Sequence, residues 1–302
     1  MKLPIGIIHA CAHVLSCLQM CILKHRRYIT SYELVTSRLV DPEHVNYMVV
    51  YRTFNIQLKS WLKMAFVSEI NPGNVHKYLQ VEGLQHLETA RSRGKGTILL
   101  NPHFGPFLFV MPALGHRGYT LNQVAYQSEP ITGKREGLAK LLYEAQFEAV
   151  EGKMPARFIN TAYNAMAMRH VIKALAYNEC VLFSPTGRGG KSWHEVMFLG
   201  RKATFNLVPF KMAIKTDSVL LPVFVLDSNP LSKIIIEDPL NLKRENTPEE
   251  LLEKYLSILS VYVKKYPDHF GFFLYDMHVK AEKGIKPFFF SDYPEPKIPR
   301  NW

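Results

Sequence analysis

A histidine at the end of a short apolar run is the residue best placed to do chemistry in this chain. The run Thr97–Leu100 is followed by Asn101-Pro102, and His103 comes next. Proline cannot donate to a strand ladder and holds the preceding residue extended, so the predicted strand ends here. Gly105 suits the turn into a following helix, and an imidazole at such a strand end can act as a general base near neutral pH. The alternative interpretation is a core histidine that is hydrogen-bonded to the backbone.

The elements that position His103 alternate between apolar strands and helices. The predicted strands are residues 75–81, 97–100, 119–126, 179–184, 218–227 and 233–238. The predicted helices are residues 84–93, 138–151, 161–177, 204–216 and 247–265, and residues 270–275 form either an aromatic strand or a short helix. This alternation predicts an α/β fold with a mostly parallel sheet flanked by helices.

The chain divides into three predicted parts. Residues 1–70 form an N-terminal helical segment, residues 71–286 form the α/β domain, and residues 287–302 form an extended tail on the surface, rich in proline and aromatic residues. Residues 4–23 are apolar enough to suggest a membrane anchor, but His9 and His13 interrupt them. Polar groups are rare in spanning helices, so we expect this helix to pack on the domain or to lie in the membrane interface.

Composition narrows the class of partner. The 302 residues include 37 Lys and Arg against 26 Asp and Glu, which gives a net charge of +11. Such a charge favours anionic partners: an acyl carrier protein, coenzyme A, an anionic membrane surface or a nucleic acid. The four cysteines lack Cys-x-x-Cys spacing and the histidines are scattered, so we expect reduced thiols and no metal site. The expected location is cytoplasmic, with a peripheral position on the inner face of the membrane as an open alternative.

The segment around His103 resembles a known family. Gly96–Gly105 is similar to the His-Phe-Gly segment of the late acyltransferases of lipid A biosynthesis, which belong to the lysophospholipid acyltransferase superfamily. Their motif is His-x-x-x-x-Asp or His-x-x-x-x-Glu, in which the acid orients the base. The resemblance implies that His103 is the general base. The position of the acid is occupied by Leu108, so this chain departs from the motif.

The resemblance extends weakly over residues 1–280. Further similar blocks are residues 154–160, 181–190, 197–204, 220–225 and 267–274. A second departure lies in the block 181–190, where Thr186-Gly187 replaces an acidic residue and Arg188 follows. The fold of the family is therefore better supported than its reaction.

Acyl transfer needs a base, donors for the oxyanion and a site for the substrates. We expect His103 to be the base and the backbone N–H near Gly105 to be an oxyanion donor. Arg157 and Arg188 are candidates for binding a phosphate or the carrier arm, and Glu195 is a candidate replacement for the missing acid. Arg188 has the alternative of simply facing solvent.

The sequence therefore predicts an acyltransferase that uses a thioester of a carrier protein or of coenzyme A, without any other cofactor. Its acceptor is an amine or a hydroxyl group. Because the motif acid is missing, two alternatives stay open: a non-catalytic protein that binds an acyl or lipid group, and a transferase with an aminoacyl-tRNA donor. The tRNA alternative agrees with the net charge of +11, but the sequence contains no nucleic-acid-binding motif that supports it.

Overall fold

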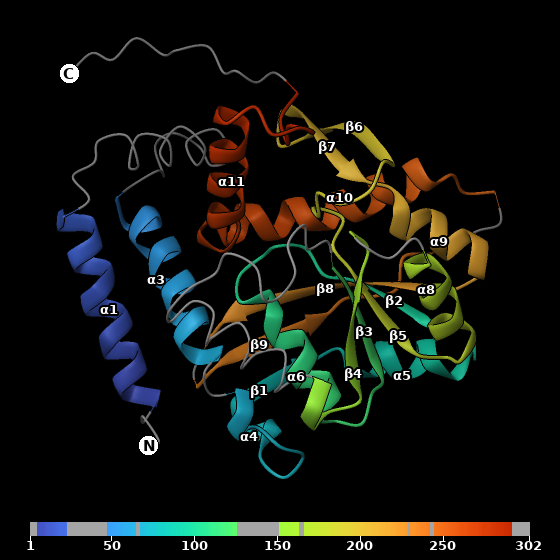
Figure 1. Ribbon diagram of the computed structural model, residues 1–302, viewed down its shortest axis with the longest axis horizontal. Helices are drawn as coiled ribbons and strands as arrows, with labels where there is room; N and C mark the ends of the chain where they lie inside the picture. The colour runs from blue at the N-terminus through green and yellow to red at the C-terminus, as the bar shows by residue number, and fades with distance from the viewer. Residues whose placement is uncertain are drawn as a thin grey trace.

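The computed structural model describes residues 5–22, 47–64, 67–125, 151–162, 166–228, 230–241 and 245–291 (Figure 1). The strands are β1 (Leu79–Glu82), β2 (Thr97–Leu100), β3 (Leu121–Ala125), β4 (Ala156–Asn160), β5 (Cys180–Phe183), β6 (Trp193–Phe198), β7 (Arg201–Asn206), β8 (Val219–Asp227) and β9 (Ser232–Ile236). The longer helices are α1 (Ile5–Ile22), α3 (Tyr47–Met64), α5 (Leu84–Ser92), α6 (Val110–Gly115), α8 (Ala167–Ala176), α9 (Val208–Thr216), α10 (Pro248–Lys265) and α11 (Pro267–Glu282). Shorter helices are α4 (Val75–Tyr78), η2 (Val67–Glu69) and η3 (Phe107–Phe109).

Within the described residues, seven strands form one mostly parallel sheet in the order β1-β9-β8-β2-β5-β3-β4. Of the strand pairs that the structure describes in this sheet, only β8–β9 is antiparallel, while β6 and β7 form a separate hairpin. The central strands β2 and β5 are buried at every position. Parallel strands that are covered by helices on both faces have continuous apolar sequences. This pattern made β2 and β5 predictable from the sequence. The prediction of an α/β fold with a mostly parallel sheet flanked by helices is confirmed.

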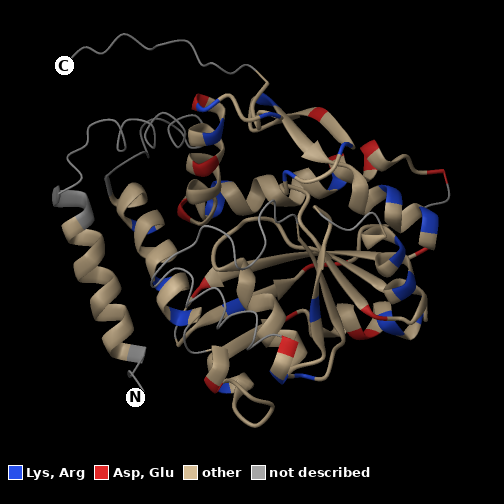
Figure 2. Cartoon of the chain, viewed as in Figure 1, with Lys and Arg blue, Asp and Glu red and all other residues tan. Residues whose placement is uncertain are grey.

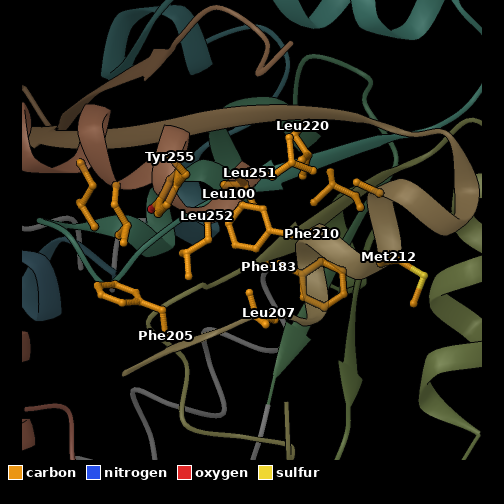
Figure 3. Packing of buried hydrophobic residues seen from close by; sticks show 14 of the residues in the cluster. Leu100, Phe183, Phe205, Leu207, Phe210, Met212, Leu220, Leu251, Leu252 and Tyr255 are labelled. Carbon is orange, nitrogen blue, oxygen red and sulfur yellow. The ribbon is translucent and has the colours of Figure 1, made fainter. Parts of the chain in front are cut away.

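The two faces of the sheet belong to two separate core clusters. Ile98 and Leu100 face a cluster completed by α8, α9, α10 and α11, part of which is drawn in Figure 3. Leu99, between them, faces a second cluster completed by α5 and α6. Alternate strand residues point to opposite faces, so one short strand supplies both cores. This arrangement fixes the position of the strand end that carries His103.

The N-terminal helices pack beside the sheet. α3 contacts both α1 and α11, and α1 lies outermost (Figure 1). Ile8, Ala12 and Ser16 of α1 are buried. Among the residues that the structure describes, no helix is both long and apolar enough to cross a membrane. Helix α1 packs on α3, and packing on the domain was one of the two arrangements that the sequence predicted.

Several predicted elements differ in the structure. Residues 204–206 belong to strand β7, and the helix predicted over 204–216 begins only at Val208. The strand predicted at 75–81 is the short helix α4 followed by β1, and residues 270–275 lie within α11. The helix predicted over 138–151 falls almost wholly outside the described residues. Of the predicted tail, residues 292–302 lie outside the described residues. In the described part, Phe289 is buried and Phe290 pairs with Ala203 of β7, so this part does not lie free on the surface.

Candidate active site

The candidate site lies where β2 and β5 end side by side. Leu100 of β2 is paired with Phe183 of β5 in parallel register. In each strand the next residues are one polar residue, a proline and then the residue of interest, which is His103 after β2 and Thr186 after β5. The equal offset from a matched pair brings the two side chains together at the carboxyl ends of the strands, where open α/β sheets place their ligands.

Two hydroxyl groups bind the ring of His103. Its Nδ1 lies 2.7 Å from Thr186 Oγ1 and 3.1 Å from Ser184 Oγ, and the two oxygens are 2.9 Å apart. The backbone N–H of His103 donates to Thr186 Oγ1 at 3.1 Å. No hydrogen-bond partner of Nε2 occurs in the part of the chain that the structure describes. Nε2 is therefore the ring nitrogen left for a substrate.

The hydroxyl network can orient the ring without a carboxylate. Thr186 Oγ1 has two lone pairs and one hydrogen. It can accept from the His103 backbone N–H and from Nδ1–H while donating its own hydrogen to Ser184 Oγ. In that arrangement the His103 backbone N–H, Nδ1–H and the Thr186 hydroxyl all have acceptors, and Nε2 carries a free lone pair. In the reverse arrangement Thr186 donates to Nδ1, Nε2 carries the hydrogen, and His103 cannot act as a base through Nε2.

The surroundings of His103 favour its neutral form. The ring stacks on Phe273 at a centroid distance of 5.5 Å and meets Phe107 edge to face at 4.9 Å. Burial lowers the pKa of His103 to about 4, with further contributions from the positive charges of Lys280 and Arg188. An imidazole with such a low pKa is neutral at pH 7, which is the form a base requires, but it is a weak base.

The loop after His103 is fixed by a glycine. Gly105 has φ +58°, and a Cβ there would lie 2.2 Å from the backbone oxygen of Val225. Its N–H donates to the carbonyl of His269 at 2.7 Å. Only glycine tolerates this combination of positive φ and close backbone approach. The expected role of the Gly105 N–H as an oxyanion donor therefore requires this hydrogen bond to break, because the group already has an acceptor.

His269, at the start of α11, was not singled out by the sequence and links three parts of the site. Its Nε2 accepts a hydrogen bond from the backbone N–H of Asp227 at 3.0 Å, so Nδ1 carries the proton and donates to Asp268 Oδ1 at 2.7 Å. Its ring stacks on Phe104, beside His103 in sequence, at a centroid distance of 5.4 Å. The residue therefore ties β8 and α11 to the loop after β2.

The two other positions considered as partners of His103 lie elsewhere. Leu108 packs against the cluster on the α5–α6 face of the sheet, whereas the ring of His103 contacts Phe273 of the opposite cluster. Glu195 is exposed on β6 and pairs with Lys202 at 3.4 Å. Hydrogen bonds from Ser291 and Lys202 hold the pKa of Glu195 below its usual value. Within the described residues, no carboxylate is hydrogen-bonded to the His103 ring.

The two candidate arginines are placed very differently. Arg188 follows Thr186 by two residues, and its charge acts on His103. Arg157 lies on β4, three strand spacings or roughly 14 Å from β2. It pairs there with Glu179 at 3.4 Å and hydrogen-bonds to Asn122. The structure brings Arg188 to the site and leaves Arg157 at the far edge of the sheet.

Replacing Thr186 with valine is expected to weaken both stability and turnover. Valine keeps the shape but removes the acceptor for the His103 N–H and the partner of Nδ1, and each lost hydrogen bond of this kind costs about 1 to 3 kcal/mol. Thr186→Ser keeps the hydroxyl and should retain most of both properties. Urea denaturation and the transfer rate measure the two effects. Wild-type turnover in Thr186→Val would show that the hydroxyl does not orient the ring.

The described residues contain no group of three or more His, Cys, Asp or Glu side chains able to hold a metal ion.

Comparison with known proteins places the chain in a family. A search of curated proteins gives no match. The family model of bacterial lipid A biosynthesis acyltransferases matches residues 2–275, which is most of the chain and includes every strand of the sheet. The chain therefore belongs to the bacterial lipid A biosynthesis acyltransferase family.

Proposed function

We propose that this protein transfers an acyl group from a thioester of a carrier protein or of coenzyme A to an amine or hydroxyl acceptor. The observation that carries the proposal is the ring of His103 at the carboxyl ends of β2 and β5, with Nδ1 bound by two hydroxyls and Nε2 without a partner among the described residues. Membership of an acyltransferase family supports the reaction class. The thioester is a co-substrate, and no further cofactor is part of the proposal.

His103 acts as the general base through Nε2. The acceptor attacks the thioester carbonyl and forms a tetrahedral intermediate, while its proton passes to Nε2. The carbon–sulfur bond then breaks, and the departing sulfur takes up a proton as the thiol. Thr186 and Ser184 hold the ring during this step by binding Nδ1. Hydrogen-bond donors that point at the developing oxyanion would stabilise the transition state further.

The low pKa of His103 favours amine acceptors over alcohols. A neutral amine attacks with its own lone pair and becomes acidic only after the new bond has formed, so a weak base is sufficient to remove its proton. An alcohol needs proton removal during the attack and hence a stronger base. Burial and the charges of Lys280 and Arg188 lower the pKa of His103 to about 4, and no motif acid raises it. We therefore propose an amine-type acceptor, such as a free amine or a hydroxylamine.

The same pKa predicts an unusual pH profile. The folded protein holds His103 neutral down to a pKa of about 4, below the 6.5 of an unperturbed histidine. The rate constant kcat/KM, corrected for the ionisation of the acceptor, is expected to stay level from pH 8 to about 5 and to fall towards pH 4. The lowered pKa of His103 also makes the stability of the fold depend on pH. The contribution of the neutral ring to the free energy of unfolding is present above pH 6.5, the pKa of an unperturbed histidine, and is lost as the pH falls through the native pKa of about 4. A midpoint near 6.5 would contradict the proposed environment of His103.

Two other functions remain as alternatives. A binding protein on this fold is favoured by Leu108, which stands where the family motif has an acid. A transferase with an aminoacyl-tRNA donor is favoured by the net charge of +11, although Figure 2 shows Lys and Arg dispersed over several helices and strands. Nucleic-acid interfaces more often gather basic residues on one face.

One assay separates these three functions. Full-length protein is incubated with carrier-protein thioesters, coenzyme A thioesters and aminoacyl-tRNA, each with an amine and with the matching alcohol. Mass spectrometry then detects products. We expect an amide from a thioester donor, with heat-inactivated protein as the control. Product only from tRNA would favour that alternative, and co-purified lipid without any product would favour the binding protein.

Peripheral membrane contact is a further part of the proposal. Ile7, Val14, Leu15 and Leu18 of α1 are exposed, and the positive net charge would favour an anionic surface. Such binding is expected to be reversed by high salt or carbonate, because exposed charges are screened over about 8 Å at physiological ionic strength. Retention that only detergent reverses would contradict peripheral binding.

A further inference from the structure

Arg188 carries a buried guanidinium group with incomplete hydrogen bonding. Its Nη2 donates to the carbonyl of Thr204 at 2.6 Å. Its Nε and Nη1 are buried, and neither has an acceptor in the described part of the chain. The guanidinium lies over the rings of Trp193 and Phe289, at 4.9 Å and 5.2 Å from their centroids. Two aromatic rings thus hold the group, while two of its nitrogens have no hydrogen-bond partner among the residues that the structure describes.

The charge of Arg188 is also unbalanced. No ion pair joins it to an Asp or Glu among the described residues, and burial lowers the pKa of Arg188 to about 10. The group still carries its charge at pH 7. A buried charge without a counter-ion is expensive, and a guanidinium with free N–H groups is well suited to a carboxylate or phosphate. The surroundings therefore suit a bound anion.

This position is linked to the proposed base through two aromatic rings, and its charge acts on the ring of His103. Thr186, two residues before Arg188, binds the ring of His103. Phe273 stacks on that ring at 5.5 Å and contacts Phe289 at 5.0 Å, and Phe289 lies against Arg188. An anion on Arg188 would therefore lie on the same side of the site as His103, separated from it by the rings of Phe273 and Phe289.

We propose that Arg188 binds a carboxylate carried by one of the two reactants. A carboxylate matches the single unpaired charge of Arg188, because Lys280, the other cation acting on His103, already pairs with Asp276 at 2.6 Å. The phosphates of coenzyme A or a carrier arm are separated from the thioester by the whole pantetheine chain, which is longer than a path across the rings of Phe273 and Phe289 requires.

The carboxylate can come from either of two reactants. Binding of a carboxylate by Arg188 does not depend on the proposed acyl transfer, but the choice between these two reactants does. It belongs either to an amino-acid-like acceptor, whose amine attacks the thioester, or to the far end of a short dicarboxylic acyl group. In both cases Arg188 would hold the carboxylate and so set the position of the reacting atom relative to Nε2 of His103. Reactants without the carboxylate should then bind more weakly.

The binding step can be tested without any turnover. Acetate is titrated into full-length protein, and the indole N–H signal of Trp193 is followed by NMR and assigned with Trp193→Phe; inorganic phosphate and sodium chloride form parallel titrations. We expect a saturable acetate shift that weakens roughly tenfold to a hundredfold in Arg188→Gln. Arg188→Lys, which keeps a charge but loses the planar fork, should also bind acetate more weakly.

A matched control is Arg201→Gln, because Arg201 likewise lies over an aromatic ring, at 3.8 Å from the centroid of Phe290. This variant should leave the acetate shift unchanged. An acetate shift that persists in both Arg188 variants, the absence of a saturable shift, or tighter binding of phosphate than of acetate would each overturn the proposal.

A transfer assay distinguishes the two sources of the carboxylate. One arm compares an amino acid with the matching amine that lacks the carboxylate, and the other compares succinyl with butyryl coenzyme A. Arg188→Gln should raise KM only for the reactant that carries the carboxylate. Acetate binding through Arg188 without transfer in any arm would support the carboxylate site and contradict the proposed function. Transfer that ignores the carboxylate and Arg188 would do the reverse.

Discussion

The variant His103→Ala is expected to transfer acyl groups about 10²–10⁴-fold more slowly than the wild type, the range expected for loss of a general base. Alanine removes Nε2, the only ring nitrogen that is left for a substrate. The fold should survive, because Thr186 Oγ1 keeps its bonds to the backbone N–H of residue 103 and to Ser184. Initial rates by mass spectrometry measure the first effect, and the melting temperature measures the second.

Two further variants sharpen this result. His170 is an exposed histidine on α8, so His170→Ala controls for loss of an imidazole and should leave the rate unchanged. His103→Gln keeps a side chain that can bond to Thr186 but provides no base, and it should be nearly as slow as His103→Ala. Turnover of His103→Ala within about twofold of the wild type would show that the acceptor needs no base at this position.

The buried strands were predictable because tertiary structure reinforced their local pattern. β2, β5 and β8 are flanked by core on both faces, so their residues are apolar at nearly every position. The hairpin β6–β7 was missed for a different reason. Its two-residue turn, Leu199-Gly200, has positive φ at both positions, and leucine is not a residue that signals such a turn. Without a turn signal, the sequence of residues 204–206 predicts the start of the next helix rather than the end of a strand.

The position of His103 could be predicted, but its partners could not. A histidine after an apolar strand and a proline indicates a strand end, and the structure places His103 there. Recognition of Thr186 needed the register of β2 against β5, which no local pattern gives. A signal existed nonetheless: both strands are followed by a polar residue and a proline, after which the chain has His103 in one case and Thr186 in the other.

The arginine candidates show the same limit. Arg157 and Arg188 both occur in segments that resemble the family, so sequence similarity did not separate them. The strand order does, because β4 is the edge strand and β5 is adjacent to β2. Burial also separates them, since Arg157 is half-exposed with Glu179 as its partner, whereas Arg188 has buried nitrogens without partners in the described residues.

Removing the carboxylate of Asp227 is expected to destabilise the protein by about 3–5 kcal/mol, the usual effect of leaving a buried charge without its partner. Asp227 ends β8 and accepts a hydrogen bond from Lys63 of α3 at 2.8 Å, and it also pairs with Lys59. Lys63 is fully buried and also donates to the carbonyls of Ser228 and Leu231, at 3.3 Å and 2.6 Å. In Asp227→Ala its ammonium group keeps only these neutral acceptors. Urea denaturation measures the loss of unfolding free energy.

The pH dependence of this loss has a definite sign. Burial alone would raise the pKa of Asp227, but Lys63 and Lys59 outweigh it and hold the pKa below the usual 3.8. A lowered carboxyl pKa stabilises the fold above pH 3.8, and that contribution disappears as the pH falls through the native pKa. The difference between wild type and Asp227→Ala should therefore be full at pH 7 and shrink below pH 3.8.

Matched variants separate a buried charge from a simple loss of contacts. Asp238 is exposed and pairs with His86 at 3.2 Å, so Asp238→Ala should change stability by less than about 1 kcal/mol. The double variant Lys63→Met with Asp227→Leu removes both charges from the buried pair and should recover much of the stability lost in Asp227→Ala. A double variant no more stable than Asp227→Ala would contradict an origin in the unpaired charge. It would indicate that the hydrogen bonds of Lys63 to Ser228 and Leu231 are what attach α3 to the end of β8.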